Sequence, residues 1–161
     1  MNVLNTPSMP PSPLELLNEV IASYNDRNFE KALMQGNKII NLHPLYHPIH
    51  NILGTINSIL GHHEQAVYHL RQAIKLEPNH AHAYNNLGVT LKNLFKYDEA
   101  QQMIEKAIKI KPDNPQAYKN LGDIFRKKNL NDLAIQNYKT SIQINPSCFE
   151  AVKNLGATLQ E

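Results

Sequence analysis

The chain has 161 residues, of which 42% are apolar, with 16 Lys and Arg against 14 Asp and Glu, eight His and one Cys. A formal charge of +2 excludes the strongly basic surface of an electrostatic nucleic-acid binder, and the apolar fraction excludes a disordered chain. The sequence offers no disulfide framework, no secretory signal and no run of about 18 apolar residues for a membrane helix, so we expect a soluble, cytoplasmic protein without a membrane partner.

The start of the chain differs in composition from the rest. Residues 1–12 are rich in Pro and Ser, which predicts an irregular leader. Beyond the leader, one proline, one alanine and one Leu-Gly pair each recur every 34 residues, and such a period is typical of a repeat architecture. The recurring residues are Pro44, Pro78, Pro112 and Pro146, then Ala32, Ala66, Ala100 and Ala134, and the pairs that begin at Leu53, Leu87, Leu121 and Leu155.

Within each repeat the apolar residues are spaced as in two amphipathic helices. In the third repeat Tyr84, Leu87 and Leu91 recur every three or four residues, and Ala100 and Ile104 begin a second such run. Pro112 follows the second run and ends its helix, and Asp113 and Asn114 beside it suit a turn and a helix cap. The sequence therefore predicts an all-α fold of antiparallel helix pairs. The expected helices span residues 14–25, 28–42, 47–60, 63–76, 81–94, 97–110, 115–128, 131–144 and 149–160.

Two consecutive units carry the full set of repeated residues. These are Tyr84, Leu87, Gly88, Leu91, Ala100, Ile104 and Pro112 in one unit, and Tyr118, Leu121, Gly122, Phe125, Ala134, Tyr138 and Pro146 in the next. In a 34-residue frame this motif resembles the tetratricopeptide repeat (TPR). The resemblance implies a right-handed superhelical solenoid in which the first helices of the pairs line a concave face.

The same resemblance divides the chain into repeats. The first repeat is degenerate, because Glu19-Val20 replaces Leu-Gly and Gly36 stands at a bulky position. The second has His50 and Asn57 where large apolar residues belong, and the chain ends inside a repeat, as a fragment would. The expected divisions are a leader (1–12), four repeats (13–46, 47–80, 81–114 and 115–148) and the first helix of a fifth (149–161).

Several polar residues fall where members of this family face the concave groove. Asn86, Asn120 and Asn154 occupy one repeat position, just before Leu-Gly. Similar asparagine ladders line the superhelix of O-linked N-acetylglucosamine transferases and hold a peptide backbone, which suits a carboxamide because it both donates and accepts hydrogen bonds. The alternative is that these three asparagines are simply solvated residues in an Asn-rich chain and bind no peptide. The resemblance implies a peptide-binding groove at Asn85, Asn86, Lys92, Asn93, Lys119, Asn120, Asp123, Arg126, Lys127, Lys153 and Asn154.

The second half of the chain is more basic than the first. Residues 81–161 hold 11 Lys and Arg against eight Asp and Glu, whereas residues 1–80 hold five against six. A basic groove would favour an acidic protein or peptide partner, although a solvated charged face would explain the same residues. The two-carboxylate clamp that the family uses for chaperone tails is not reproduced, because Asp123 stands where its asparagine belongs.

We expect the histidines and the cysteine to have structural or incidental roles. His47 and His50 lie one helical turn apart, a spacing that can share a metal ion, but the sequence places no Cys or carboxylate beside them to complete a site. Cys148 falls in a turn without the partners that nucleophilic catalysis needs. We therefore expect no metal, no cofactor, no nucleic-acid partner and no catalysis by this chain.

Three functional hypotheses remain open at this point. The leading one is a protein-interaction scaffold that binds an extended segment of a partner in the concave groove. In the second, the repeats are the substrate-recruiting N-terminal region of a larger enzyme, since similar arrays precede bacterial glycosyltransferase, sulfotransferase and methyltransferase domains. In the third, copies of the chain associate through the uncapped C-terminal end.

Overall fold

The computed structural model describes residues 12–160, apart from the side chain of His47, so nearly all of the expected leader lies outside the described residues. The regular structure of the described residues is entirely helical, which confirms the all-α prediction, and the helix ends differ from the expected ones by no more than two residues. The helices are α1 (Pro13–Asn25), α2 (Phe29–Leu42), α3 (His47–Ile59), α4 (His63–Leu76), α5 (Ala81–Asn93), α6 (Tyr97–Ile110), α7 (Pro115–Lys127), α8 (Asn131–Ile144) and α9 (Phe149–Thr158).

Short-range hydrogen bonds fix where the helices begin. The Ser12 hydroxyl accepts from the Glu15 backbone N–H at 3.3 Å, and the Glu15 carboxylate accepts from the Ser12 N–H at 2.8 Å. This reciprocal capping satisfies two backbone donors that the helix itself leaves unpaired. Asn114 caps α7 through the Gln116 N–H, and Pro115 supplies a first residue with a preset φ.

Each of the helices α1, α3, α5 and α7 ends in the same left-handed turn. The N–H of the residue after the turn donates to a carbonyl five residues earlier, as in Lys96 to Leu91 at 3.0 Å, which is the Schellman arrangement. Only one of the four turns has the glycine that this backbone favours. The turn residues and their φ angles are Arg27 (57°), Gly61 (79°), Phe95 (60°) and Asn129 (60°).

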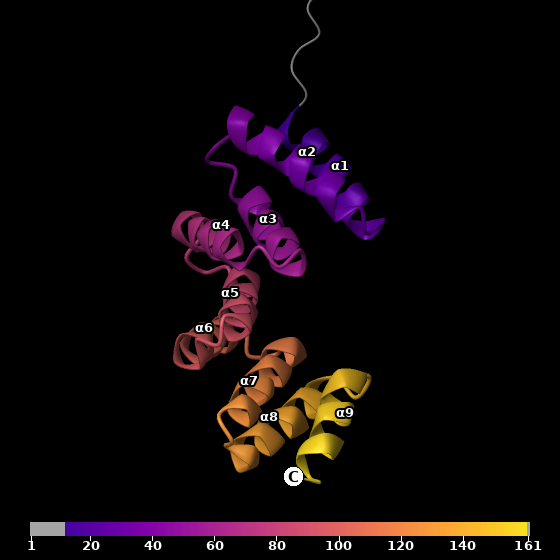
Figure 1. Ribbon diagram of the computed structural model, residues 1–161, viewed down its shortest axis with the longest axis vertical. Helices are drawn as coiled ribbons and strands as arrows, with labels where there is room; N and C mark the ends of the chain where they lie inside the picture. Colours follow the sequence, from indigo (N-terminus) through magenta and orange to yellow (C-terminus); the bar gives the residue numbers. More distant parts are fainter. Residues whose placement is uncertain (1–11, 161) are drawn as a thin grey trace, which may run out of the picture.

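The repeated glycines set how closely paired helices approach. A Cβ on Gly88 would lie 2.5 Å from the Ile104 side chain, and one on Gly122 would lie 2.6 Å from the Tyr138 ring. The small residue on one helix therefore makes room for the large residue 16 positions later on its partner. Because each pair buries only one face in this way, the pairs stack on one another, as they do along the vertical axis of Figure 1.

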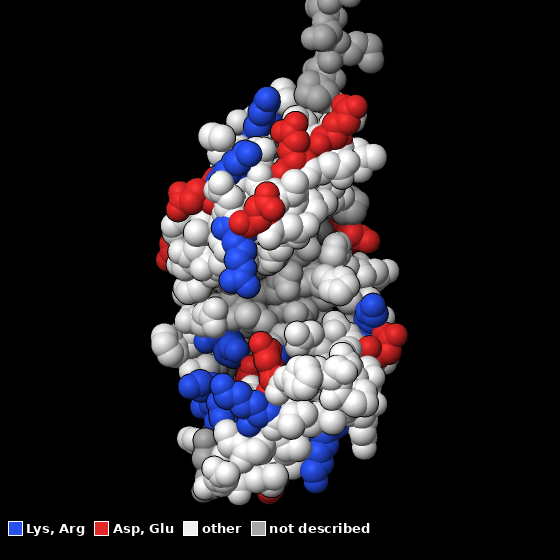
Figure 2. All heavy atoms as spheres, turned by 90° about the vertical axis from the view of Figure 1, so that its right-hand side faces the viewer, with Lys and Arg blue, Asp and Glu red and all other residues white. Residues whose placement is uncertain are grey.

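The stacking gives the array two sides. Within it α3 contacts α5, α5 contacts α7 and α7 contacts α9, so these four helices form a continuous layer. Helices α4 and α6 lie on the left of this layer in Figure 1, while α1 and α9 reach to the right. The side built from α1, α3, α5, α7 and α9 is called the inner side below. Figure 2 faces it and shows that it is hollowed near the middle.

The apolar core falls into two clusters. One includes Leu16, Val20 and Leu53 and belongs to α1, α2 and α3, and the other extends from Leu70 to Tyr138. The polar His50 and Asn57 are also buried on α3, with exposed fractions of 5% and 3%. The two substitutions noted in the second repeat thus place polar side chains in the buried part of α3.

Candidate binding groove

A cavity of about 450 Å³ opens on the inner side between α1, α3 and α5. Three of its side chains are apolar or aromatic and three are carboxamides, and none of the described residues that line it is Lys, Arg, Asp or Glu. This cavity is called the N-terminal pocket below. It is lined by Ile21, Tyr24, Asn25, Asn51, Ile52, Thr55, His82 and Asn86.

The predicted asparagine ladder is a set of hydrogen bonds between neighbouring odd-numbered helices. Asn86 Nδ2 donates to Thr55 Oγ1 at 3.0 Å and to Asn51 Oδ1 at 3.3 Å, which joins α5 to α3. Asn120 Nδ2 donates to Asn85 Oδ1 at 3.0 Å and joins α7 to α5. The ladder therefore fixes the spacing of the helices that form the inner side.

These bonds change how the asparagines are expected to meet a ligand. Asn85 and Asn120 are buried, with 8% and 6% exposed, and Asn86 and Asn154 are half-buried. Asn93, by contrast, is exposed. Of the five predicted asparagines, Asn86 also lines the N-terminal pocket, so it combines a bond within the array with access to the groove.

Asp123 is the centre of a second polar cluster, where α7 meets α5, α8 and α9. Its carboxylate accepts from the Tyr138 hydroxyl at 2.9 Å and from Asn154 Nδ2 at 2.8 Å. Lys92 Nζ lies 3.5 Å and Lys119 Nζ 3.6 Å from its other oxygen. One carboxylate thus holds two lysines of adjacent helices on the inner side.

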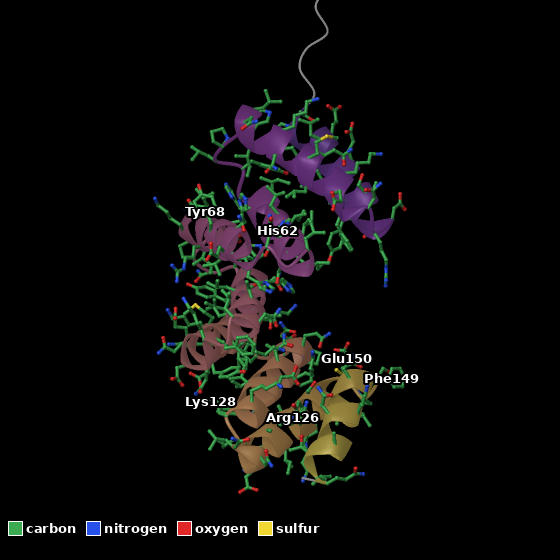
Figure 3. The ribbon with its side chains drawn as sticks, in the orientation of Figure 1. His62, Tyr68, Arg126, Lys128, Phe149 and Glu150 are labelled. Atoms are coloured by element: carbon green, nitrogen blue, oxygen red, sulfur yellow. The ribbon has the colours of Figure 1, made fainter. Side chains whose placement is uncertain are left out.

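The other predicted basic residues lie on α7 and α9, which also carry members of this cluster. Lys119 also pairs with Glu150 at 3.1 Å, and Figure 3 shows Glu150 at the beginning of α9. Arg126 is half-buried, whereas Lys127 and Lys153 are exposed. In Figure 2, blue Lys and Arg side chains accordingly surround red ones below the hollow. The basic half of the groove is defined here as Lys92, Lys119, Arg126, Lys127 and Lys153.

Most of the N-terminal pocket was missed by the sequence analysis, although the 34-residue period contains it. Asn51 lies one period before the predicted Asn85, and Thr55 lies two periods before Asp123. Tyr24 lies two periods before Lys92. Carrying each predicted groove position back through the earlier repeats would have identified these residues, including those in the degenerate first repeat.

The histidines contribute to the packing between α3 and α4. His50 Nδ1 lies 3.2 Å from His69 Nδ1, and His50 Nε2 lies 3.4 Å from the Pro44 carbonyl oxygen. Because that carbonyl can only accept, His50 donates from Nε2, and His69 donates from its Nδ1 to the Nδ1 of His50. Burial lowers the pKa of His50, and burial together with the neighbouring His50 lowers the pKa of His69 to about 4.

His50 and Cys148, which were considered for metal binding and nucleophilic catalysis, do not line the N-terminal pocket. The side chain of His47 lies outside the described part of the structure, and the described side chains include no group of three His, Cys, Asp or Glu that could hold a metal ion. Cys148 is half-buried and precedes α9. Among residues 12–160, none of the helices is long and apolar enough to cross a membrane.

Comparison with known proteins identifies the repeat. The family model described as tetratricopeptide repeat matches residues 81–114 and 115–148, and a second, described as TPR repeat, matches residues 59–94. The two models together span residues 59–148, more than half of the chain. No curated protein matches the sequence significantly.

Solved structures share the fold at low sequence identity. The thermophilic TPR protein TTC0263 of Thermus thermophilus is 19% identical, with a TM-score of 0.83 over 95% of this chain and 84% of that one. YrrB, described as a TPR protein with an unusual peptide-binding site, is 20% identical, with a TM-score of 0.76 over 88% and 73% of the two chains. A chain of the APC/C hetero-tetramer Cut9–Hcn1 is 20% identical, with a TM-score of 0.87 over 92% of this chain and 30% of that one.

Proposed function

This chain belongs to the tetratricopeptide repeat family, and we propose that it is an interaction scaffold whose inner side binds an extended segment of a partner protein. The N-terminal pocket is the observation that carries the proposal, because it is a cavity of about 450 Å³ built only from odd-numbered helices. The description of YrrB as having a peptide-binding site supports this use of the fold.

The chemistry of the inner side suits a peptide backbone. Asn25 and Asn51 present carboxamides at the pocket, and each can donate to a peptide carbonyl or accept from a peptide N–H. Ile21 and Ile52 beside them offer apolar contact to a side chain of the same segment. A groove of this kind binds main chain through its amides and selects side chains through its pocket.

The asparagine ladder contributes to binding by holding the groove in shape. Bonds such as Asn86 to Thr55 and Asn120 to Asn85 keep successive helices at a fixed spacing before a ligand arrives. A preorganised groove loses less conformational entropy when it binds, so more of the contact energy appears as affinity.

Our second hypothesis, that the chain is the substrate-recruiting region of a larger enzyme, stays a prediction. In that case the substrate protein would bind in this same groove.

A substitution inside the pocket, compared with one outside it, tests the proposal. Ile21 is 38% exposed and lines the pocket, so Ile21→Arg should block it without disturbing the core. Met34, which is 67% exposed on α2 and does not line the pocket, provides the matched control Met34→Arg. The ligand is a peptide selected from a random library against the native chain, and its affinity is measured by calorimetry.

Ile21→Arg should weaken binding by at least about tenfold, because a charged side chain displaces an apolar one from the pocket. Met34→Arg should bind like the native chain. Equal affinities for all three proteins, or a loss confined to Met34→Arg, would place the binding surface elsewhere.

A further inference from the structure

The groove has two chemically different halves, and this difference constrains what it binds. We infer that the bound segment carries a bulky apolar side chain for the N-terminal pocket and acidic residues over the basic half. This inference rests on the proposed function, since it presumes that a segment lies along the inner side. It adds a partner class, namely an acidic segment with one apolar anchor.

The N-terminal pocket selects for an uncharged anchor. Ile21, Tyr24 and Ile52 give it an apolar surface, while its polar groups are carboxamides, a hydroxyl and an imidazole. A charged side chain that entered would lose water without meeting an opposite charge among the described lining residues. An apolar side chain would instead gain from leaving water, and the amides at the rim would remain available to its backbone.

Among the described residues, the lysines of the basic half outnumber the carboxylates that pair with them. Asp123 pairs with Lys92 and Lys119, and Lys119 also pairs with Glu150, so these two carboxylates meet two lysines. Lys127 and Lys153, which are exposed, add further positive charge. Lys153 lies one 34-residue period after Lys119, whose Nζ contacts Asp123. Charge complementarity therefore favours an anionic segment here.

The spacing between the two features follows from the repeat geometry. The pocket is centred on α3 and the basic half on α7, so two steps between neighbouring odd-numbered helices separate them. Packed helices lie about 8–10 Å apart, which makes the separation roughly 20 Å. An extended chain covers that distance in about six residues, so the anchor and the acidic residues should be about six positions apart.

A second basic surface on the opposite side of the array gives a matched control. A cavity of about 560 Å³ there is lined by Tyr84, Lys106 and Lys109, among others. Lys109 is exposed, as Lys153 is, but it lies on α6. Charge reversal at Lys109 therefore changes the net charge by the same amount as reversal at Lys153 and leaves the inner side unaltered.

The experiment uses four synthetic peptides in a Gly-Ser background. The four designs carry Ile or Ser at the anchor position and three Glu or three Gln about six residues away. Each design is made in two versions, with the anchor either before or after the Glu or Gln residues. Fluorescence anisotropy measures their affinity for the native chain and for Ile21→Arg, Lys153→Glu and Lys109→Glu. The library-selected peptide described above is run beside them.

The peptide with both Ile and Glu should bind about tenfold more tightly than either peptide that lacks one feature. Ile21→Arg should abolish the advantage of Ile and keep that of Glu, whereas Lys153→Glu should reduce the advantage of Glu about threefold or more. Lys109→Glu should leave both advantages unchanged.

Two results would overturn the inference, and they differ from a failure of the proposed function. If all four peptides bind equally, or none binds while the library-selected peptide does, the groove binds segments but does not select an acidic one with an apolar anchor. If Lys109→Glu rather than Lys153→Glu removes the advantage of Glu, the acidic residues bind the opposite side. Loss of the proposed function itself would appear as insensitivity of the library-selected peptide to Ile21→Arg.

Discussion

At the scale of single residues, the sequence predicted the identity of the groove asparagines better than their surroundings. The period placed Asn86, Asn120 and Asn154 at one repeat position, and the structure adds that each donates to the preceding odd-numbered helix. Those contacts depend on the distance between two helices, which the one-dimensional pattern does not contain. Replacing these asparagines should therefore affect stability as well as binding.

Asn120→Ala tests that structural role. The substitution removes the donor to Asn85 Oδ1 in a buried environment, and leaving a buried acceptor unpaired costs about 1–3 kcal/mol. Asn93→Ala is the control, because Asn93 is exposed and surface substitutions usually change stability by less than about 0.5 kcal/mol. Urea unfolding should show a lower midpoint for Asn120→Ala alone, and equal midpoints would contradict the bridging role.

The His50–His69 pair should make stability depend on pH. The pKa of His69 is lowered to about 4 in the folded state, so the unfolded chain, with an ordinary pKa of 6.5, binds more protons in between. Stability is then complete above pH 6.5 and falls as the pH drops toward 4, by up to about 3 kcal/mol for this group.

His69→Asn isolates this effect, because an amide nitrogen can replace the Nδ1 donor to His50 but does not titrate. Chemical unfolding at a series of pH values should give a shallower decline below pH 6.5 for the variant than for the native chain. Parallel curves for the two proteins would mean that carboxylates alone cause the acid sensitivity.

At the scale of helices, the sequence predicted nearly everything that local patterns determine. Apolar spacing and the periodic prolines placed every helix of the described chain within two residues of its ends. The left-handed turns were not predicted, because three of the four carry Arg27, Phe95 or Asn129 instead of glycine. At these three turns the tertiary packing imposes a left-handed backbone conformation that the residue type does not predict.

The repeated glycines allow one substitution to be compared in two environments. In Gly88→Ala the new Cβ would lie 2.5 Å from Ile104 and 3.0 Å from the Ala100 carbonyl oxygen, so overpacking should cost about 1–3 kcal/mol. In Gly156→Ala the Cβ meets nothing within 4 Å, so the better helix former should add about 0.5–1 kcal/mol. Thermal unfolding should show shifts of opposite sign, and a shared sign would refute the close-approach role of Gly88.

At the scale of the whole molecule, α9 presents an apolar face that the described residues do not cover. Phe149 is 80% exposed, Leu159 63% and Val152 47%. Exposed apolar surface of this kind favours association, so self-association through this end, expected from the sequence, stays a prediction. Sedimentation should show a mass that rises with concentration and a weaker rise for Leu159→Ser, whereas a strict monomer at high concentration would rule the association out.

The location of the groove shows how far a repeat pattern predicts a binding site. The resemblance to the repeat family implied a groove along the first helices of the pairs, and the structure places Asn86 and Lys92 on α5 and Lys119 on the neighbouring α7. It did not predict that the cavity opens between α1, α3 and α5, since cavity volume depends on how side chains of three repeats leave space. The least regular repeats thus line the pocket.

Chemical-shift mapping shows directly which helices a bound peptide contacts. Amide resonances of the isotopically labelled chain are recorded with and without a saturating library-selected peptide. Binding along the inner side predicts that the largest shifts belong to α1, α3, α5 and α7, with Ile21, Ile52 and Asn86 among them. Shifts concentrated on α2, α4, α6 and α8 would contradict the account, because the peptide would then bind outside the groove.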